Sequence, residues 1–399
     1  MTIARRTFLA AFAGQLPARA GVKITGVETV ALEVSGKYNF SLVRVSTDGG
    51  ITGIGQAESP SLVIEAAIRH RNGLEKLLRG EDPFDVERLW QKMYAATSLW
   101  GRRGVTIAAI GAVETALWDI AGKILQKPVA ELIWRSAATV KDQAAIRPRV
   151  RPYATVYHPG STDAEIRARF QQAVDRGFRA VKFEEVPNGF AHGDVKTDVR
   201  LVRLVRDIIG EDRDLMIDVQ NVWRDVRRAV ETARAIEPFH IYFLEAPLPP
   251  DNLEAYRRLA DRVDIPIAAG DWGFTTRFEF LDLMDRGGVD VVQPSTVRSG
   301  GIAEIVKIAE MAFRRGLVSI PHCWNHMVGV AAAVHLAAVL PNMPYIEYPL
   351  AFPDSPLISD LLEPPLRLDA HGWIEVPQRP GLGFVLNEKL VQRYRVPPS

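Results

Sequence analysis

Short apolar runs alternate with amphipathic segments along the second half of the chain. The runs indicate strands at residues 151–157, 178–184, 214–219, 240–246, 265–270, 289–294, 317–322 and 344–348. Between the runs, apolar positions recur at helical spacing over residues 161–176, 198–209, 224–236, 253–262, 277–286, 301–315 and 328–340. Near-continuous apolar strands joined by helices are typical of a parallel sheet with both faces buried. The pattern therefore predicts the α/β class, with a (β/α)8 barrel over residues 146–350.

The first part of the chain follows a different pattern. Three stretches within residues 22–57 alternate apolar and polar positions, with a turn signal at Asp48, Gly49 and Gly50. Helical periodicity follows at residues 60–79, 85–96 and 105–124. We therefore predict an α+β domain over residues 22–145. Residues 351–399 are rich in proline and glycine, and we expect them to be irregular and to return to this first domain.

Acidic residues end three consecutive predicted strands at nearly constant spacing. Asp218, Glu245 and Asp271 are separated by 27 and 26 residues (245 − 218 and 271 − 245). One strand–helix unit of a (β/α)8 barrel needs roughly 30 residues, and the chemistry of such barrels lies at the C-terminal ends of the strands. Three carboxylates that converge there would form an oxygen-rich site suited to Mg²⁺. The alternative is that each is a surface carboxylate at the start of a loop.

Two groups suited to proton transfer end other strands of the series. Lys182 ends the second strand, where a nearby cation and partial burial would lower its pKa toward that of a general base. Glu184 lies on the same strand face, where it would pair with Lys182 or face the substrate. His322 ends the seventh strand and is a candidate acid or base. Glu347 ends the eighth and is a candidate for hydrogen bonding the substrate carboxylate. Each residue has an alternative interpretation: Lys182 would be exposed to solvent, His322 would be a core residue, and Glu347 would have a structural role.

Tryptophans follow several of these strand ends. Trp272 and Trp324, like Trp223, lie within a few residues of a candidate site residue. They would wall the pocket against water, or simply pack the loops. A zinc site made by His322 and His326 is disfavoured, because the histidine-pair motif needs one helix and an intervening glutamate, whereas Pro321 precedes this pair.

Composition limits the remaining classes of function. The formal net charge is +1, which gives no basic surface for nucleic acid, and no run of about 18 apolar residues predicts a membrane span. A single cysteine excludes an intrachain disulfide. Residues 1–21 carry paired arginines, a short apolar run and a small-residue site, as a twin-arginine export signal does. A cytoplasmic extension is the alternative, so periplasmic and cytoplasmic locations both stay open.

Several segments resemble one known family. They read ALWDIAGKILQKPVAELIW, LMIDVQ, FLEAPLPPDNLEAYRRLA, IPIAAGDW, VDVVQPSTVRSGGI, PHCW, IEY and PGLGF. Over residues 22 to about 395, the chain resembles the enolase superfamily, mandelate racemase / muconate lactonizing enzyme-like branch, and especially its acid-sugar dehydratases. The resemblance implies an α+β capping domain over a modified (β/α)7β barrel and a homo-oligomer.

The resemblance also implies residue roles. Asp218, Glu245 and Asp271 would bind one Mg²⁺ per subunit, Lys182 and His322 would transfer protons, and Glu347 would be the eighth-strand carboxylic acid. Capping-domain loops around Tyr38 and around residues 100–103, which include Arg103, would close over a small-molecule carboxylate substrate.

Four positions depart from the family pattern. Asp271 stands where glutamate is usual, Ala246 where a second glutamate is usual, and Glu184 where a second lysine is common. Ser295 stands where an aspartate normally orients the histidine, and we group it with the residues that line the substrate pocket. Without that carboxylate, His322 loses the partner that would raise its pKa. We therefore expect a weaker base that acts mainly as an acid.

The predicted activity is Mg²⁺-dependent removal of the proton next to a carboxylate. In the enolase superfamily this chemistry uses a lysine or histidine base, with the metal stabilising the charge that develops. We predict dehydration of an aldonate or aldarate to a 2-keto-3-deoxy acid, with Lys182 as base and His322 as acid. Lactone cycloisomerisation or epimerisation is the alternative within the class. A non-catalytic binding homologue, suggested by Ser295 and Ala246, is the alternative outside it.

Overall fold

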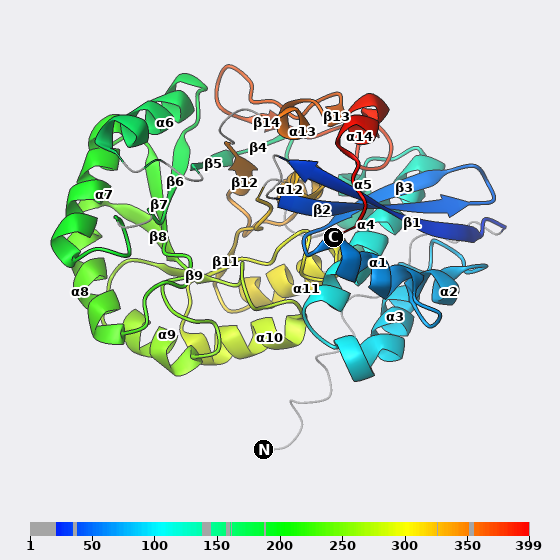
Figure 1. Cartoon of the computed structure of the whole chain (residues 1–399), viewed down its shortest axis with the longest axis horizontal. Coiled ribbons are helices and arrows are strands. Elements are labelled where there is room, and N and C mark those ends of the chain that lie inside the picture. Colours follow the sequence, from blue (N-terminus) through cyan, green and yellow to red (C-terminus); the bar gives the residue numbers. More distant parts are fainter. Residues whose placement is uncertain are drawn as a thin grey trace.

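The computed structural model describes residues 21–34, 38–137, 145–156, 160, 162–186, 189–324, 326–350 and 355–398. The N-terminal extension predicted at residues 1–21 therefore lies outside the described residues, apart from Gly21. In Figure 1 the eight-stranded sheet and its helices curve around one side of the molecule, and the N-terminal strands and helices lie on the other.

Three antiparallel strands and five helices form the N-terminal layer. The strands are β1 (Ile24–Val34), β2 (Tyr38–Thr47) and β3 (Thr52–Ala57), paired in that order. The helices are α1 (Ser61–Arg69), α2 (Leu74–Leu78), α3 (Val86–Gly101), α4 (Val105–Leu125) and α5 (Val129–Ser136). The single helix predicted at residues 60–79 is wrong, because the chain turns at Gly73, where a Cβ would lie 2.5 Å from the carbonyl oxygen of Ile68.

Helix α4 is the core of this layer. Among the described helices, it alone is long and apolar enough to cross a membrane, but almost all of it is buried within the protein. It packs closely on β3 because that strand has glycine where side chains would collide. A Cβ at Gly53 would lie 2.0 Å from the carbonyl oxygen of Ala116, and one at Gly55 would lie 1.8 Å from that of Ala112. The amphipathic strand pattern and the glycines together fix the position of α4.

Eight parallel strands form the barrel, as predicted from the sequence. They are β5 (Pro152–Val156), β6 (Ala180–Glu184), β7 (Asp214–Asp218), β8 (Ile241–Glu245), β9 (Ile267–Ala269), β10 (Val291–Val292), β11 (Val318–Ser319) and β12 (Ile346–Pro349). Their order is β11-β10-β9-β8-β7-β6-β5-β12. In the described residues no strand pairing joins β11 to β12. Instead, the Cys323 amide beyond β11 donates to Glu347 Oε2 at 2.9 Å.

Seven helices connect the strands, which gives the (β/α)7β form. They are α6 (Asp163–Asp175), α7 (Val195–Ile209), α8 (Val226–Ile236), α9 (Leu253–Ala260), α10 (Arg277–Asp282), α11 (Ile302–Phe313) and α12 (Met327–Val339). Short helical turns follow α8 at Glu237–Phe239 and α10 at Leu283–Gly287. Polar side chains accept from the first-turn amides of four of these helices, as N-caps do: Thr162, Asp194, Asp225 and Asn252.

The C-terminal residues pack back on the N-terminal layer. They form α13 (Pro356–Ser359), β13 (Leu362–Glu363), β14 (Ile374–Glu375), β15 (Val385–Leu386) and α14 (Glu388–Tyr394), and β14 pairs with β4 (Arg149–Val150). An antiparallel bridge joins Arg395 to Leu32 of β1, and Glu388 pairs with Arg44 of β2 at 2.8 Å. These contacts link the two ends of the described chain (Figure 1).

Candidate active site at the mouth of the barrel

A first layer of buried side chains fills the barrel interior, with one residue from each strand or its edge: Tyr153, Ala180, Met216, Phe243, Ala268, Val291, Ile320 and Tyr345. Residues two apart in a strand face the same side. The next inward positions toward the C-terminal ends are therefore Thr155, Lys182, Asp218, Glu245, Gly270, Gln293, His322 and Glu347. Every residue of this second layer is buried. Polar residues thus replace apolar ones at the step where the barrel opens.

Lys182 lies at the centre of the acidic part of this layer. Its Nζ is 2.9 Å from Glu245 Oε1, 3.0 Å from Glu347 Oε1 and 3.4 Å from Asp218 Oδ2. Burial lowers the pKa of Lys182, but these carboxylates outweigh burial and raise it well above its ordinary value. The lowered pKa expected from the sequence depends on a cation next to the ammonium, so it stays a prediction for the metal-bound site.

Like charges crowd the acidic side of the mouth. Glu184, Asp218 and Glu245 lie in register on adjacent strands, and each is buried. Burial, and then the neighbouring Asp218, raise the pKa of Glu245 and bring that of Asp271 to about 7. The same two causes raise the pKa of Glu184. The single positive charge of Lys182 does not balance the negative charges of these buried carboxylates.

The donor set fits a divalent cation in its chemistry. In the described residues, no three histidine, cysteine or acidic side chains are arranged as a ready metal cluster, and Lys182 pairs with two of the candidate ligands, Asp218 and Glu245. However, Asp218, Glu245 and Asp271 supply the hard oxygen ligands that Mg²⁺ prefers. Their mutual repulsion is the imbalance that such an ion would relieve.

Asp271 reaches the mouth through a turn in the backbone. The inward position of its strand is Gly270, whose φ of 120° is available to glycine and whose Cβ would lie 2.5 Å from Phe280 Cε1. Positive φ also follows the other two predicted ligands, at Gln220, two residues after Asp218 (54°), and at Ala246, directly after Glu245 (45°). Such angles cost non-glycine residues about 1–2 kcal/mol. The backbone is thus turned sharply after each of these strands.

His322 contacts neutral and positive groups. Its Nδ1 is 3.2 Å from Ser295 Oγ, and Arg298 Nη2 lies 3.3 Å from Nδ1 and 3.5 Å from Nε2. Burial and then Arg298 lower the pKa of His322 to about 4, against the raising effect of Glu347. The weakened basicity expected from the sequence is present. The expected role as mainly an acid is not supported, because a neutral ring holds no extra proton at pH 7.

Glu347 is an acceptor in this arrangement. It accepts from Lys182, from the hydroxyl of Thr155 and from the amide of Cys323. Although burial acts to raise the pKa of Glu347, Lys182 and His322 hold it at about 2. The protonated carboxylic acid implied by the family resemblance is therefore not the state that these contacts favour.

The predicted pocket residues are only partly brought together. Trp272 is 48% exposed, and Arg298 lies over its ring at 5.0 Å. Trp324 stacks obliquely with His326 at 6.3 Å between ring centroids. Tyr38 begins β2, but its side chain lies outside the described part of the structure.

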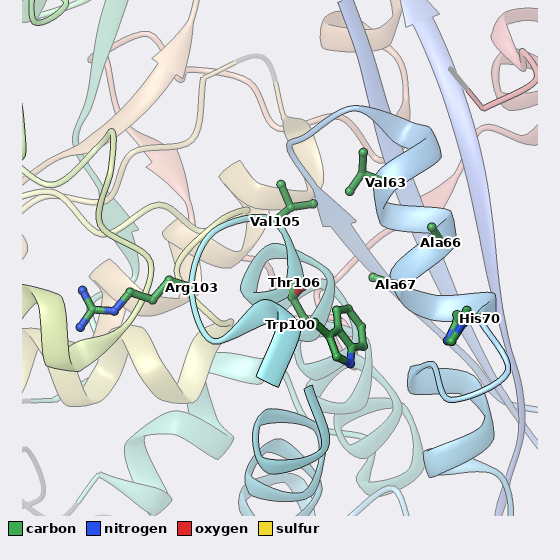
Figure 2. Close-up of a pocket in the computed structure, with 8 residues that line it drawn as sticks. All are labelled: Val63, Ala66, Ala67, His70, Trp100, Arg103, Val105 and Thr106. Atoms are coloured by element: carbon green, nitrogen blue, oxygen red, sulfur yellow. The ribbon is translucent and has the colours of Figure 1, made fainter. Parts of the chain in front are cut away.

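Arg103 faces the barrel from the N-terminal layer. It pairs with Glu279 of α10 at 3.1 Å, and the amide of Gly104 donates to Thr275 Oγ1 at 3.0 Å. Arg103 also borders a pocket of about 620 Å³ between α1 and the α3–α4 loop, lined further by Trp100 and His70. Figure 2 shows Arg103 pointing away from these two side chains. This pocket is separate from the carboxylates of the barrel mouth.

Three polar residues at the mouth were not singled out from the sequence. Arg298 and Glu58 form an ion pair at 3.2 Å beside His322. Gln293 belongs to the second interior layer, and among the described residues neither polar atom of its amide has a partner. The strand-end rule that found His322 also applied to Gln293, because it lies two residues after the inward-facing Val291.

Comparison with known proteins agrees with the geometry. Residues 165–390 match the family described as Enolase C-terminal domain-like. Residues 19–134 match the family described as Mandelate racemase / muconate lactonizing enzyme, N-terminal domain. The arabinonate dehydratase of Saccharolobus solfataricus is 31% identical over 98% of both chains.

Solved structures give the same result. The 3,6-anhydro-D-galactonate cycloisomerase from Zobellia galactanivorans is 29% identical, with a TM-score of 0.83 over 94% of this chain and 100% of that one. A racemase from Streptomyces coelicolor A3(2) with bound magnesium is 25% identical, with a TM-score of 0.81 over 94% and 100% of the two chains. This chain therefore belongs to the mandelate racemase / muconate lactonizing enzyme family of the enolase superfamily.

Proposed function

We propose that this protein is a Mg²⁺-dependent dehydratase of acid sugars, which converts an aldonate or aldarate to the 2-keto-3-deoxy acid. The observation that carries the proposal is the second interior layer of the barrel. It sets a crowded carboxylate group on β7 and β8, with Asp271 after β9, beside two proton-transfer groups, Lys182 and His322. The arabinonate dehydratase that is 31% identical over nearly the whole chain supports the same reaction class.

Asp218, Glu245 and Asp271 are the residues that would hold the metal. When bound, Mg²⁺ would stabilise the negative charge that develops on the substrate carboxylate as the neighbouring proton leaves. The chain's own contribution is to bury these carboxylates and to fix their direction through the turns at Gly270 and after Asp218 and Glu245.

Lys182 and His322 lie on opposite oxygens of the Glu347 carboxylate. Lys182 Nζ is 3.0 Å from Glu347 Oε1, and His322 Nε2 is 3.9 Å from Glu347 Oε2. Because its contacts favour a neutral ring, we assign His322 to accept the α-proton. Lys182 is assigned to protonate the β-hydroxyl as it leaves as water. The enol that results takes a proton at the β-carbon to give the keto acid. This reverses the roles expected from the sequence.

Lactone cycloisomerisation is the second candidate. It begins with the same proton removal, and the cycloisomerase structure with a TM-score of 0.83 favours it. The two reactions differ in mass balance, because dehydration releases water and cycloisomerisation gives an isomer.

The test is a substrate panel in D₂O. The full-length protein with Mg²⁺ is incubated with aldonates, aldarates and their lactones, and the products are read by NMR and mass spectrometry. We expect one acid sugar to lose water and gain deuterium at the β-carbon. His322→Asn should abolish this loss of water, because the variant cannot remove the α-proton.

The panel also reports the other outcomes. An isomer of unchanged mass would indicate the cycloisomerase, and deuterium at the α-carbon without loss of water would indicate an epimerase. If Mg²⁺ binds but no member of the panel changes, the enzymatic proposal fails, and a binding homologue becomes the better description.

A further inference from the structure

A line of charged groups crosses from the N-terminal layer to His322. Glu58 directly follows β3, Arg298 lies in the loop after β10, and His322 follows β11. Arg298 Nε is 3.2 Å from Glu58 Oε2, and its Nη2 is 3.3 Å from His322 Nδ1. The guanidinium thus contacts an anion of one layer and the histidine of the other.

The backbone holds this line in place. The amide of Glu58 donates to the carbonyl of Val297 at 3.2 Å, which ties β3 to the loop that carries Arg298. The amide of Arg298 donates to Ser295 at 3.2 Å, and a parallel bridge joins Ser295 to His322. The indole of Trp272 lies against the guanidinium at 5.0 Å. The Arg298 side chain is therefore only 15% exposed and has little freedom to turn away.

The contacts of Arg298 constrain the charge of the histidine ring. A guanidinium has only donors and is always positive. It is therefore compatible with a neutral imidazole and repels an imidazolium. Ser295 supplies a hydrogen bond without charge. The other charged groups that face the ring are Glu347 of β12, Glu58 after β3 and Lys182 of β6.

The same contacts also change the pKa of Glu58. Burial acts to raise its pKa, yet Arg298, His326 and His322 together hold the pKa below its ordinary value. A carboxylate here balances the guanidinium, so that a buried positive charge can remain next to the ring. Without Glu58, Arg298 would gain by turning toward Glu347 or solvent.

We propose that Arg298 is a positioning residue for His322, and that Glu58 holds it there, so that the N-terminal layer keeps the ring uncharged and able to accept a proton. This inference gives a chemical reason for the serine at position 295, because a carboxylate there would compete for the same guanidinium. It rests on the proposed function only in one respect, which is that the neutral His322 ring accepts the α-proton of the substrate.

The test follows the charge of His322 directly. The full-length protein with Mg²⁺ and isotope-labelled histidine is titrated, and ring-nitrogen NMR shifts are followed, with His322→Asn assigning the signal. We expect a neutral ring at pH 7. Arg298→Gln should raise the titration midpoint by about one pH unit or more, and Arg298→Lys should keep it near the original value.

A second ion pair across the same boundary provides the matched control. Glu87 of α3 pairs with Lys307 of α11 at 2.6 Å, away from His322. Glu87→Gln removes a carboxylate as Glu58→Gln does, and it should leave the midpoint unchanged. A protonated ring at pH 7 in the unaltered protein, or a midpoint unaffected by folded Arg298→Gln, would overturn the proposal.

A further pair of variants covers the case in which Arg298→Gln does not fold. Ser295→Asp should raise the midpoint into an accessible range. Adding Glu58→Gln should then raise it further, because Arg298 is released from the ring, whereas adding Glu87→Gln should not. A midpoint lowered by Glu58→Gln would mean that Glu58 acts only through its own charge, which raises the pKa of His322, and would reject its holding role. Equal midpoints for the two double variants would reject the role of Glu58. Because no substrate enters this experiment, a failed substrate panel leaves it interpretable.

Discussion

Helix α4 and the barrel mouth both bury carboxylates, but they surround them differently. On α4, Glu114 accepts from the amides of Ile302 and Ala303 at 2.6 and 2.9 Å and from Trp118 Nε1 at 2.7 Å. At the mouth, Asp218 acts to raise the pKa values of Glu245 and Asp271, and Lys182 pairs with both Asp218 and Glu245.

The second acid of α4 follows the same structural rule as Glu114. Asp119 accepts from the amides of Ile54 and Leu382 at 3.0 and 2.9 Å and from Lys123 at 2.6 Å. Fixed N–H groups from separate parts of the chain thus meet each oxygen. A buried acid matched by fixed donors joins segments of the fold, whereas buried acids that face one another call for a cation.

The largest expected effect comes from removing one acid at the mouth. Asp271→Asn should lower kcat/KM at least ~10³-fold, because a metal ligand is worth several kcal/mol in the transition state. The Mg²⁺-dependent rise in melting temperature should disappear. The metal-free protein should be as stable as before, or more stable by about 1 kcal/mol, because repulsion is relieved.

The same substitution on α4 is the control for that experiment. Asp119→Asn should cost about 2 kcal/mol or more of unfolding free energy and keep the response to Mg²⁺. Retained turnover in Asp271→Asn, or loss of the Mg²⁺ response in Asp119→Asn, would remove the distinction between the two regions.

The next effect tests the junction between α4 and α11. Gly301 has φ 96°, and a Cβ there would lie 2.2 Å from Glu114 Oε2. Gly301→Ala should therefore cost about 3 kcal/mol in denaturant unfolding. Gly80, with φ 82° and nothing near its Cβ position, is the control, and Gly80→Ala should cost only about 1 kcal/mol. Equal losses would mean that the contact with Glu114 contributes nothing.

The smallest effect, taken per pH unit, concerns the titration of Glu114. Burial, against three hydrogen bonds, raises the pKa of Glu114 from 4.5 to about 8. The folded state then binds more protons than the unfolded state between these values, so stability falls as pH rises through the window. We expect a slope on the order of 1 kcal/mol per pH unit that Glu114→Gln reduces. An unchanged slope in that variant would contradict this origin.

The periodicity of the sequence was sufficient for the barrel and for its strand-end acids. Strand and helix periods differ, so apolar runs locate β5 to β12, and parity within each run places Lys182, Asp218, Glu245, His322 and Glu347 on the inner face. The position of Asp271 at a strand end was predicted from the sequence. Its approach to the barrel mouth depends on the φ angle of Gly270, which the amino-acid pattern does not specify.

The charge states could not be read from the same pattern. The pKa of Lys182 depends on how many carboxylates reach its nitrogen, which is set by distances between strands. Arg298 was missed because its importance comes from Glu58, which is remote in sequence and belongs to another layer. Local patterns carry no information on such a pair.

The return of the C-terminal residues to β1 and β2 has a consequence for how the chain is made. Glu388 meets Arg44 across 344 residues, and Leu382 meets Asp119 across 263. On a ribosome, the first layer emerges long before the residues that complete it. That layer must wait, incompletely covered, while the barrel is synthesised, and contacts of such long range form slowly. The period before the last turn of α14 appears is when a chaperone would matter most to this protein.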